Sequence, residues 1–243
     1  MTETLRQDCL PDGVTTIWQD AKEFCFTTDA VFLAAFPYLV KKAKVLELGC
    51  GTGAVSLLLA NRGAAHVLGV DINPHVVELL QRSIRDNHLE DRVEAKVLDL
   101  RDYKQLPCDA LDLVAANPPY RIGGRQRQVG QAACHEVGTT LEDFFRAAAY
   151  ALKTKGRFAL VQLPERFTDA VKLGLQYHLE LKRLQWVHSY VDRPAWIFLA
   201  EFVKGGRPGL DVLPPLIMYN QDGSYSRQTL VYYGKEEAEE HGK

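Results

Sequence analysis

The stretch KVLELGCGTG, residues 44–53, decides the fold of this chain. The apolar run KVLEL ends in three alternating glycines, and the residues that follow, AVSLLLAN, predict a helix. Glycines at such a turn let the backbone bend tightly and approach a ligand closely. Asp71 follows Gly53 by 18 residues and ends the next apolar run, where a carboxylate can accept both hydroxyls of a ribose. The stretch therefore predicts a nucleotide-like ligand at the end of a parallel strand.

Working outward from this stretch, short apolar runs alternate with amphipathic ones. Strands are predicted for KVLELGC, HVLGVDI, VEAKVLDL, LDLVAAN and RFALVQL. Helices are predicted for GAVSLLLANRG, PHVVELLQRSIRDNHL and LEDFFRAAAYALK, with another inside ERFTDAVKLGLQYHL. This alternation predicts an α/β fold, with a doubly wound, mostly parallel sheet and helices on both faces.

Two further runs, LQWVHSY and IFLAEFV, complete a sheet of seven strands. Their connection, VDRPA, is too short for a crossover helix, so they should form an antiparallel hairpin at one edge. LIMYNQDGSYSRQTLVYY predicts a terminal hairpin that turns at Asp222-Gly223. We expect residues 1–43 to be a hairpin-and-helix lead-in packed on the same domain, residues 44–234 to be the main domain, and residues 235–243 a charged tail.

Composition indicates an ordinary globular protein. Of 243 residues, 47% are hydrophobic and 25% are charged. No apolar run approaches the ~20 residues of a membrane span, and the first residues lack the apolar core of a signal peptide, so we expect a cytoplasmic protein with no membrane partner. Five cysteines without a CxxC pair favour reduced thiols over disulfides or zinc. The tail KEEAEEHGK accounts for the net charge of −2, and overall charge does not indicate a nucleic-acid partner.

The glycines alone fit either a nicotinamide dinucleotide or S-adenosylmethionine. Glu47 gives the form ELGCGTG, which resembles motif I of class I methyltransferases. The spacing also departs from GxGxxG, since Ala54 and Ser56 follow the third glycine. A sheet that finishes in an antiparallel hairpin resembles the same class. S-adenosylmethionine is therefore the expected cofactor, and a tight turn without a ligand is the alternative.

Asn117-Pro118-Pro119-Tyr120 ends the fourth strand, because proline cannot continue a central strand. It matches the NPPY motif of methyltransferases that act on amines attached to planar systems. The Asn117 side-chain oxygen and the Pro118 carbonyl can each accept one N–H of such an amine and stabilise its developing positive charge. Tyr120 can stack on a base. The alternative is a strand stop with no further role.

The chain resembles the bacterial tRNA adenine-N6 methyltransferase family, which modifies the adenine beside the anticodon of a valine tRNA. The resemblance rests on Phe24, Phe26 and Thr27-Thr28-Asp29-Ala30 before an apolar helix, on ELGCGTG and NPPY, on His135-Glu136 with LEDF, on RFALVQLPER, and on KGGRPGLDVLPPLIMYNQDGSY. It implies a Rossmann-like class I methyltransferase acting on RNA, with tRNA near the anticodon as the expected substrate. Members typically have arginine where this chain has Cys134, which leaves the RNA substrate open.

The resemblance also implies site residues. The catalytic set is Asn117, Pro118, Pro119 and Tyr120. The cofactor contacts are Thr28, Asp29, Glu47, Gly49, Cys50, Gly51, Gly53, Asp71, Ile72, Asp99, Leu100 and Asn117. Arg121, Arg125 and Arg127 can pair with RNA phosphates, with a solvated loop as the alternative. Asp29 as a helix N-cap and Asp99 as a solvated cap also remain open. No metal site is expected.

Other functions share these features. Protein glutamine N5-methylation of the release-factor type and methylation of an exocyclic amine in rRNA both use a planar amine. A non-catalytic module that binds S-adenosylmethionine and RNA is a candidate of another class, as is an NAD-dependent oxidoreductase. The sequence does not give the oligomeric state.

Overall fold

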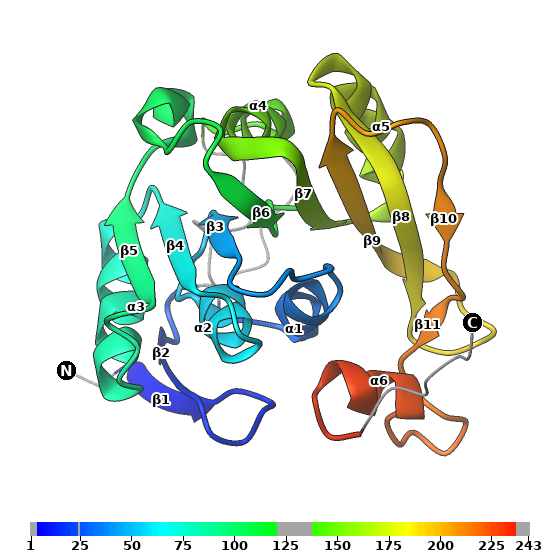
Figure 1. The fold of residues 1–243 in the computed structure, drawn as a ribbon. Helices are drawn as coiled ribbons and strands as arrows, with labels where there is room; N and C mark the ends of the chain where they lie inside the picture. The colour runs from blue at the N-terminus through cyan, green and yellow to red at the C-terminus, as the bar shows by residue number, and fades with distance from the viewer. Residues whose placement is uncertain (1–3, 24, 121–137, 237–243) are drawn as a thin grey trace.

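The structure is a computed structural model that describes residues 4–23, 25–120 and 138–236. Within these residues, a nine-stranded sheet has helices on both faces, and a two-stranded sheet lies beside it (Figure 1). The strands are β1 (Leu5–Cys9), β2 (Thr16–Asp20), β3 (Lys44–Leu48), β4 (His66–Asp71), β5 (Val93–Val97), β6 (Leu111–Ala116), β7 (Leu152–Gln162), β8 (Leu179–His188), β9 (Ala195–Lys204), β10 (Asp211–Val212) and β11 (Leu216–Ile217). The helices are α1 (Thr28–Ala35), α2 (Ala54–Asn61), α3 (Pro74–Asp86), η1 (Leu100–Gln105), α4 (Leu141–Ala151), η2 (Pro164–Arg166), α5 (Phe167–Gln176) and α6 (Arg227–Tyr232).

The predicted α/β fold is confirmed. The strand order of the large sheet is β10-β8-β9-β7-β6-β3-β4-β5, and β11 also pairs with β8. The seven predicted strands are β3 to β9; β9 runs antiparallel to β7 and β8, and the other neighbours among the seven are parallel. Strands β10 and β11 add two residues each beyond β8. The carboxyl ends of β5, β4, β3 and β6 therefore meet at one edge of the sheet.

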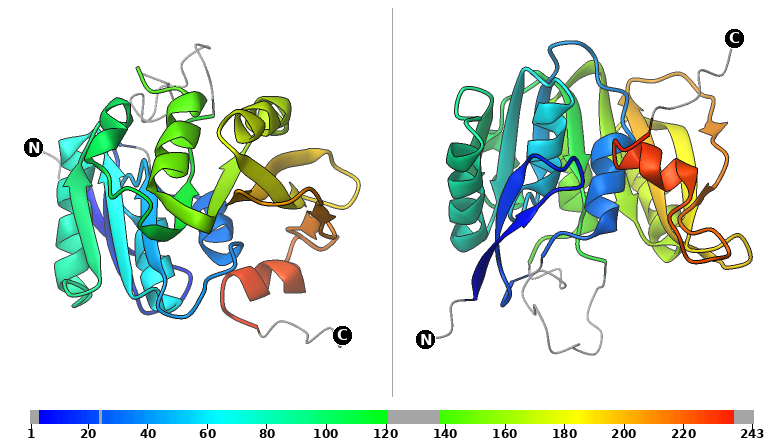
Figure 2. Two further views of the ribbon diagram at one scale, coloured as in Figure 1. Left: turned by 45° about the horizontal axis from the view of Figure 1, so that its top comes forward. Right: turned by 90° about the horizontal axis from the view of Figure 1, so that it is seen from below.

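The sheet separates two hydrophobic cores, because side chains alternate between its faces along each strand. Val45 and Leu113 belong to the core with α1, α2 and α3, whereas Leu46 and Val114 belong to the core with α4 and α5. Figure 2 shows these helices covering opposite faces. Strands with apolar side chains on both faces are typical of parallel sheets. Because both faces of these strands are buried, the predicted site residues lie at the carboxyl edge of the sheet.

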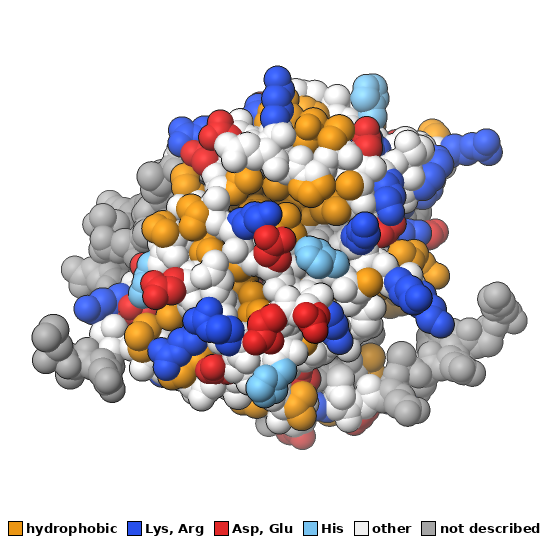
Figure 3. Space-filling view, turned by 60° about the vertical axis from the view of Figure 1, so that its left-hand side comes forward, with side chains coloured by type: hydrophobic (Ala, Val, Ile, Leu, Met, Phe, Trp, Pro, Cys, Tyr) orange, Lys and Arg blue, Asp and Glu red, His pale blue; other side chains and the backbone are white. Residues whose placement is uncertain are grey.

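The first described residues form the β1–β2 hairpin and then α1. The hairpin lies against α3, where Ser83 Oγ accepts the Trp18 N–H at 2.9 Å. On the face around β5 and α3, Lys and Arg side chains are interspersed with Asp and Glu (Figure 3).

The division into lead-in, main domain and tail stays a prediction, and residues 237–243 lie outside the described ones. Within the described parts of the chain, every helix lacks the length and apolar character of a membrane crossing.

The predicted terminal hairpin is wrong in its second limb. The turn lies at Asp222-Gly223 as expected, with φ +85° at Gly223 and a single bridge from Tyr219 to Tyr225. The chain then enters α6 in place of a strand. Ser226 caps this helix by accepting the Thr229 N–H at 3.2 Å, which favours a helical start over continued pairing.

Candidate functional site

The glycine loop (Gly49–Gly53) joins the carboxyl end of β3 to α2. Gly49, Gly51 and Gly53 have φ values of +68°, +51° and +89°, a region that disfavours residues with a Cβ. A Cβ at Gly53 would lie 2.2 Å from Leu80 Cδ1, whereas one at Gly51 would meet no heavy atom within 4 Å. Packing therefore requires glycine at position 53, and the space beside Gly51 is open to a ligand.

Asp71 lies at the end of β4, next to the glycine loop. Its Oδ2 accepts the Gly51 N–H and its Oδ1 accepts the Asn73 N–H, each at 2.9 Å. Burial raises the pKa of Asp71 against the effect of these bonds. The neighbouring Ile72 is apolar and 49% exposed. A fixed carboxylate beside an open glycine turn, with an exposed apolar side chain next to it, fits the ribose and adenine of S-adenosylmethionine.

Glu47 is buried behind the loop, with 3% of its surface exposed. Its Oε2 accepts the backbone N–H of Ser56 at 2.8 Å and the Ser56 hydroxyl at 2.5 Å, in the first turn of α2. Burial raises the pKa of Glu47 to about 8, although the Ser56 bonds lower it. Glu47 therefore holds the start of α2 to β3. The sequence alone does not single out Ser56 as its partner.

Cys50 is buried within the same loop. Its backbone N–H donates to the Val70 carbonyl at 2.9 Å, which fixes the loop to β4. Burial raises the pKa of its thiol well above the usual range. Any contact of this residue with a cofactor is thus expected from its backbone.

Asp99 follows β5 and caps the 3₁₀ helix η1, accepting the Arg101 N–H at 2.9 Å. The Arg101 guanidinium also pairs with this carboxylate and, with the other Arg101 bonds, lowers the pKa of Asp99. Leu100 is buried. The capping role is thus present in the structure, and an adenine amine would have to share the carboxylate with Arg101.

Asn117 and Tyr120 leave the end of β6 and converge on Asp29 of α1. Asn117 Nδ2 donates to Asp29 Oδ2 at 3.1 Å, and the Tyr120 hydroxyl donates to the same oxygen. Asp29 is buried, with 1% of its surface exposed. Burial and the charge of Asp29 raise the pKa of Tyr120 well above its usual value, so its hydroxyl remains a donor. This contact turns the Asn117 amide nitrogen toward Asp29.

Asp29 is not the N-cap of α1, as one reading of the sequence suggested. Thr27 occupies that position, and Asp29 lies in the first turn, where Oδ1 accepts the Thr27 hydroxyl and the Ala30 N–H. Thr28 Oγ1 lies 3.3 Å from the Tyr233 hydroxyl. The structure therefore links α1 to both the NPPY segment and the last helix.

Several predictions fall on residues that the structure does not describe. Arg121, Arg125 and Arg127 lie outside the described residues, as do Cys134 and the pair His135-Glu136. Within residues 4–23, 25–120 and 138–236, the structure has no group of three or more His, Cys, Asp or Glu side chains that could hold a metal ion.

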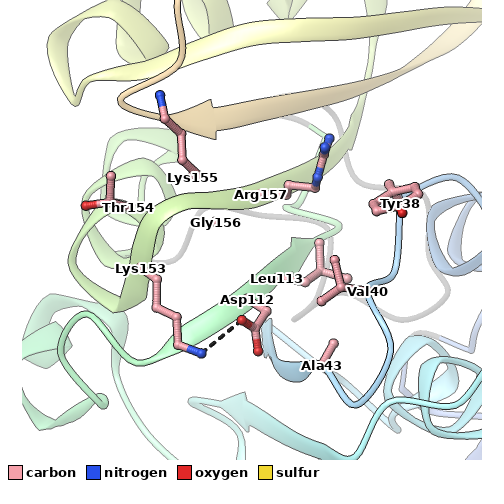
Figure 4. A pocket seen from close by; sticks show the side chains of 10 residues that line it. All are labelled: Tyr38, Val40, Ala43, Asp112, Leu113, Lys153, Thr154, Lys155, Gly156 and Arg157. Carbon is pink, nitrogen blue, oxygen red and sulfur yellow. Dashed lines mark hydrogen bonds and ion pairs between the residues drawn. The ribbon is translucent and has the colours of Figure 1, made fainter.

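A cavity of about 230 Å³ lies at the opposite end of β6, around Tyr38, Asp112 and Lys153 (Figure 4). Lys153 pairs with Asp112 at 2.9 Å, and Arg157 pairs with Glu201. Because these charges are already paired and the cavity is remote from the carboxyl edge, it has no part in the candidate site.

The chain is similar to known methyltransferases. The profile of the methyltransferase small domain family matches residues 26–179. A Bacteroides thetaiotaomicron protein named tRNA1(Val) (adenine(37)-N6)-methyltransferase is 30% identical over 173 residues, covering 69% of this chain and 72% of that relative. A protein of the same name from Aliivibrio salmonicida is 28% identical over 206 residues, covering 81% and 84%.

Solved structures show the same fold. A predicted O-methyltransferase from Agrobacterium tumefaciens is similar with a TM-score of 0.71 at 21% identity, covering 85% of this chain and 96% of that one. TYW2 from P. horikoshii, in complex with MeSAdo, has a TM-score of 0.60 at 18% identity, covering 84% and 73%. The architecture is that of class I methyltransferases.

Proposed function

Since the chain belongs to the methyltransferase small domain family, we propose that it methylates the exocyclic N6 amine of an adenine in RNA, with tRNA near the anticodon as the substrate. Family membership itself makes the chain an S-adenosylmethionine-dependent methyltransferase. The RNA substrate is the proposal. It is supported by the NPPY segment and by the names of the two relatives.

The observation that carries the proposal is the contact of Asn117 with Asp29. A carboxylate accepts hydrogen bonds but donates none. Asp29 therefore holds the amide nitrogen of Asn117, so the amide oxygen is the atom of this side chain that can act as an acceptor. With the Pro118 carbonyl, this oxygen can accept both N–H bonds of a planar amine.

Two acceptors matter because the amine is a poor nucleophile. Its lone pair is delocalised into the ring, and the nitrogen becomes positive as it bonds to the methyl carbon. S-adenosylmethionine, when bound, supplies that methyl group on a positively charged sulfur. Oxygens fixed before the reaction stabilise the developing charge without reorganising. The nitrogen then loses one proton to solvent water.

The test is methyl transfer from labelled S-adenosylmethionine to tRNA taken from cells that lack this protein. Digestion and mass spectrometry should identify N6-methyladenosine, and wild-type tRNA, already modified, should accept less label. Separate rRNA and protein fractions serve as competing substrates. Label confined to rRNA would reassign the substrate, and label confined to a glutamine of a protein would replace the RNA proposal.

A further inference from the structure

Four tyrosines form a continuous row at the carboxyl edge of the sheet. The ring centroids of Tyr190 and Tyr219 are 5.5 Å apart, those of Tyr219 and Tyr225 5.3 Å, and those of Tyr225 and Tyr233 5.3 Å. Tyr219 and Tyr225 are stacked, with an angle of 18° between their planes. We call Tyr190, Tyr219, Tyr225 and Tyr233 the tyrosine row.

The row begins after the carboxyl end of β8 and ends beside the candidate site. Tyr190 follows the carboxyl end of β8, and Tyr219 lies next to it because its N–H donates to the Ser189 carbonyl at 3.0 Å. At the other end, the Tyr233 hydroxyl lies 3.3 Å from Thr28 Oγ1, and the next residue along α1 is Asp29. Figure 2 shows α6, which Tyr233 follows, lying beside α1. A ligand on the row would thus extend toward the NPPY segment.

Two of the four tyrosines in the row are exposed, and the other two are partly exposed. Tyr190 is 37% exposed and Tyr225 is 40% exposed, whereas Phe32, next to Tyr233, is fully buried. Burial raises the pKa of Tyr233 to about 12, so its hydroxyl is neutral at physiological pH. Adjacent aromatic rings that are neutral and partly exposed offer a surface on which unpaired bases stack.

We propose that the tyrosine row binds unpaired bases of the RNA that neighbour the target adenine. The inference rests on the proposed function, because it assumes that the substrate is RNA. Sequence-selective RNA enzymes commonly act on loops whose bases are splayed out and stacked on aromatic side chains. Steps of 5.3–5.5 Å between the ring centroids give the row a length of a few nucleotides at the ~3.4 Å spacing of stacked bases.

Charge around the row points to stacking as the main attraction. Arg193 is exposed in the same loop as Tyr190 and forms no ion pair with any other described residue. Two exposed carboxylates oppose the approach of phosphates: Asp192, between β8 and β9, and Asp222, in the turn between Tyr219 and Tyr225. Because these three charges sum to −1, they offer phosphates no net attraction, and we expect the contribution of the row to come from stacking and not from phosphate contacts.

The experiment compares Tyr190→Ala and Tyr225→Ala with Tyr38→Ala. Tyr38 is a matched control, because it is 59% exposed and lines the cavity at the opposite end of β6. We expect each row variant to raise the KM for undermodified tRNA and the Kd for a short oligoadenylate RNA about 10-fold. The value of kcat and the Kd for S-adenosylmethionine should stay within about twofold. Tyr225→Phe, which keeps the ring, should behave as wild type.

Two outcomes would overturn the inference. One is oligoadenylate binding that the row variants and Tyr38→Ala leave equally unchanged. The other is a loss shared by Tyr225→Phe, which would assign the effect to the hydroxyl. Binding to oligoadenylate is measured without methyl transfer, so it tests the row even if no RNA is methylated. Failure of methylation alone would count against the proposed function.

Discussion

The glycine loop after β3 and the NPPY segment after β6 lie at the same edge of the sheet but are held in different ways. The loop is fixed by partners close in the chain: Glu47 binds Ser56, nine residues on, and Asp71 binds Gly51, 20 residues back. The NPPY segment is fixed by Asp29, which is 88 residues from Asn117 and 91 from Tyr120.

The geometry of the two segments therefore has different origins. The glycine loop is held by β3, α2 and the β4–α3 segment that follows them directly in the chain. The acceptor amide of Asn117 depends on the position of α1 in the lead-in. Substitutions in α1 should therefore act on the reaction, whereas substitutions in the loop should act on stability and cofactor affinity.

The largest expected effect is that of Asn117→Ala, which removes one of the two acceptors. We expect kcat to fall by about 10²–10³-fold, the loss typical of one pre-organised polar group. The unfolding free energy should change by only about 1 kcal/mol, since Asp29 keeps other donors. Asn61→Ala, in α2, is the matched control and should keep wild-type kcat. A kcat for Asn117→Ala within a few-fold of wild type would mean that the NPPY segment ends β6 and has no catalytic role.

A pair of glycine variants sharpens the description of the loop. Gly53→Ala should destabilise the fold by about 2–3 kcal/mol in urea unfolding, because its Cβ would overlap Leu80 at a positive φ. Gly51→Ala has only the strain of its φ and should cost about 1 kcal/mol. Calorimetry should show that it weakens S-adenosylmethionine binding, because its Cβ enters the open space. Unchanged affinity in Gly51→Ala would mean that the cofactor does not approach this position.

Asp29→Asn tests the dependence on α1 directly. The substitution keeps the shape of residue 29 but removes the charge. An amide at position 29 can donate as well as accept, so it no longer fixes the orientation of the Asn117 amide group. Hydrogen bonds to a charged group contribute ~1.5–3 kcal/mol, and we expect kcat to fall by about 10–100-fold. The double variant with Asn117→Ala should be no slower than Asn117→Ala alone, because both act through one amide.

Asp12→Asn provides the control for Asp29→Asn, as Asp12 also accepts local hydrogen bonds in the lead-in. Its kcat should equal that of wild type. If Asp29→Asn raised the Kd for S-adenosylmethionine and left kcat unchanged, Asp29 would be a cofactor contact alone. Additive losses in the double variant would likewise separate it from Asn117.

The same contrast explains what the sequence could predict. The seven main strands and the glycine loop could be predicted, since the residues that form each of them lie close together in the chain. The bond from Asp29 to Asn117 has no local signal, because two segments 88 residues apart meet only in the folded chain. Helix α6 is a different failure: RQTLVY is short and rich in residues that also suit strands, and the Ser226 cap decides for the helix.

Glu47 should make the stability of the fold around the glycine loop depend on pH. Its pKa is about 8 in the folded chain, against the usual 4.5. Between these values the folded state binds more protons than the unfolded state, so stability falls as the pH rises. The contribution is complete below about pH 4.5 and is lost as the pH passes about 8.

Urea unfolding of wild type and Glu47→Gln isolates this contribution from other titrating groups. Between about pH 6 and 7, the unfolding free energy of wild type should fall by about 1.4 kcal/mol more than that of Glu47→Gln. This is the change per pH unit when the folded state binds one proton more than the unfolded state. Ser56→Ala removes the hydroxyl bond, which lowers the pKa of Glu47, keeps the backbone N–H bond, and should extend the loss to higher pH. Parallel curves for wild type and Glu47→Gln would mean that the folded chain keeps Glu47 ionised. In that case a buried, charged carboxylate of Glu47, and not a neutral carboxyl group, would bind Ser56 and hold the loop.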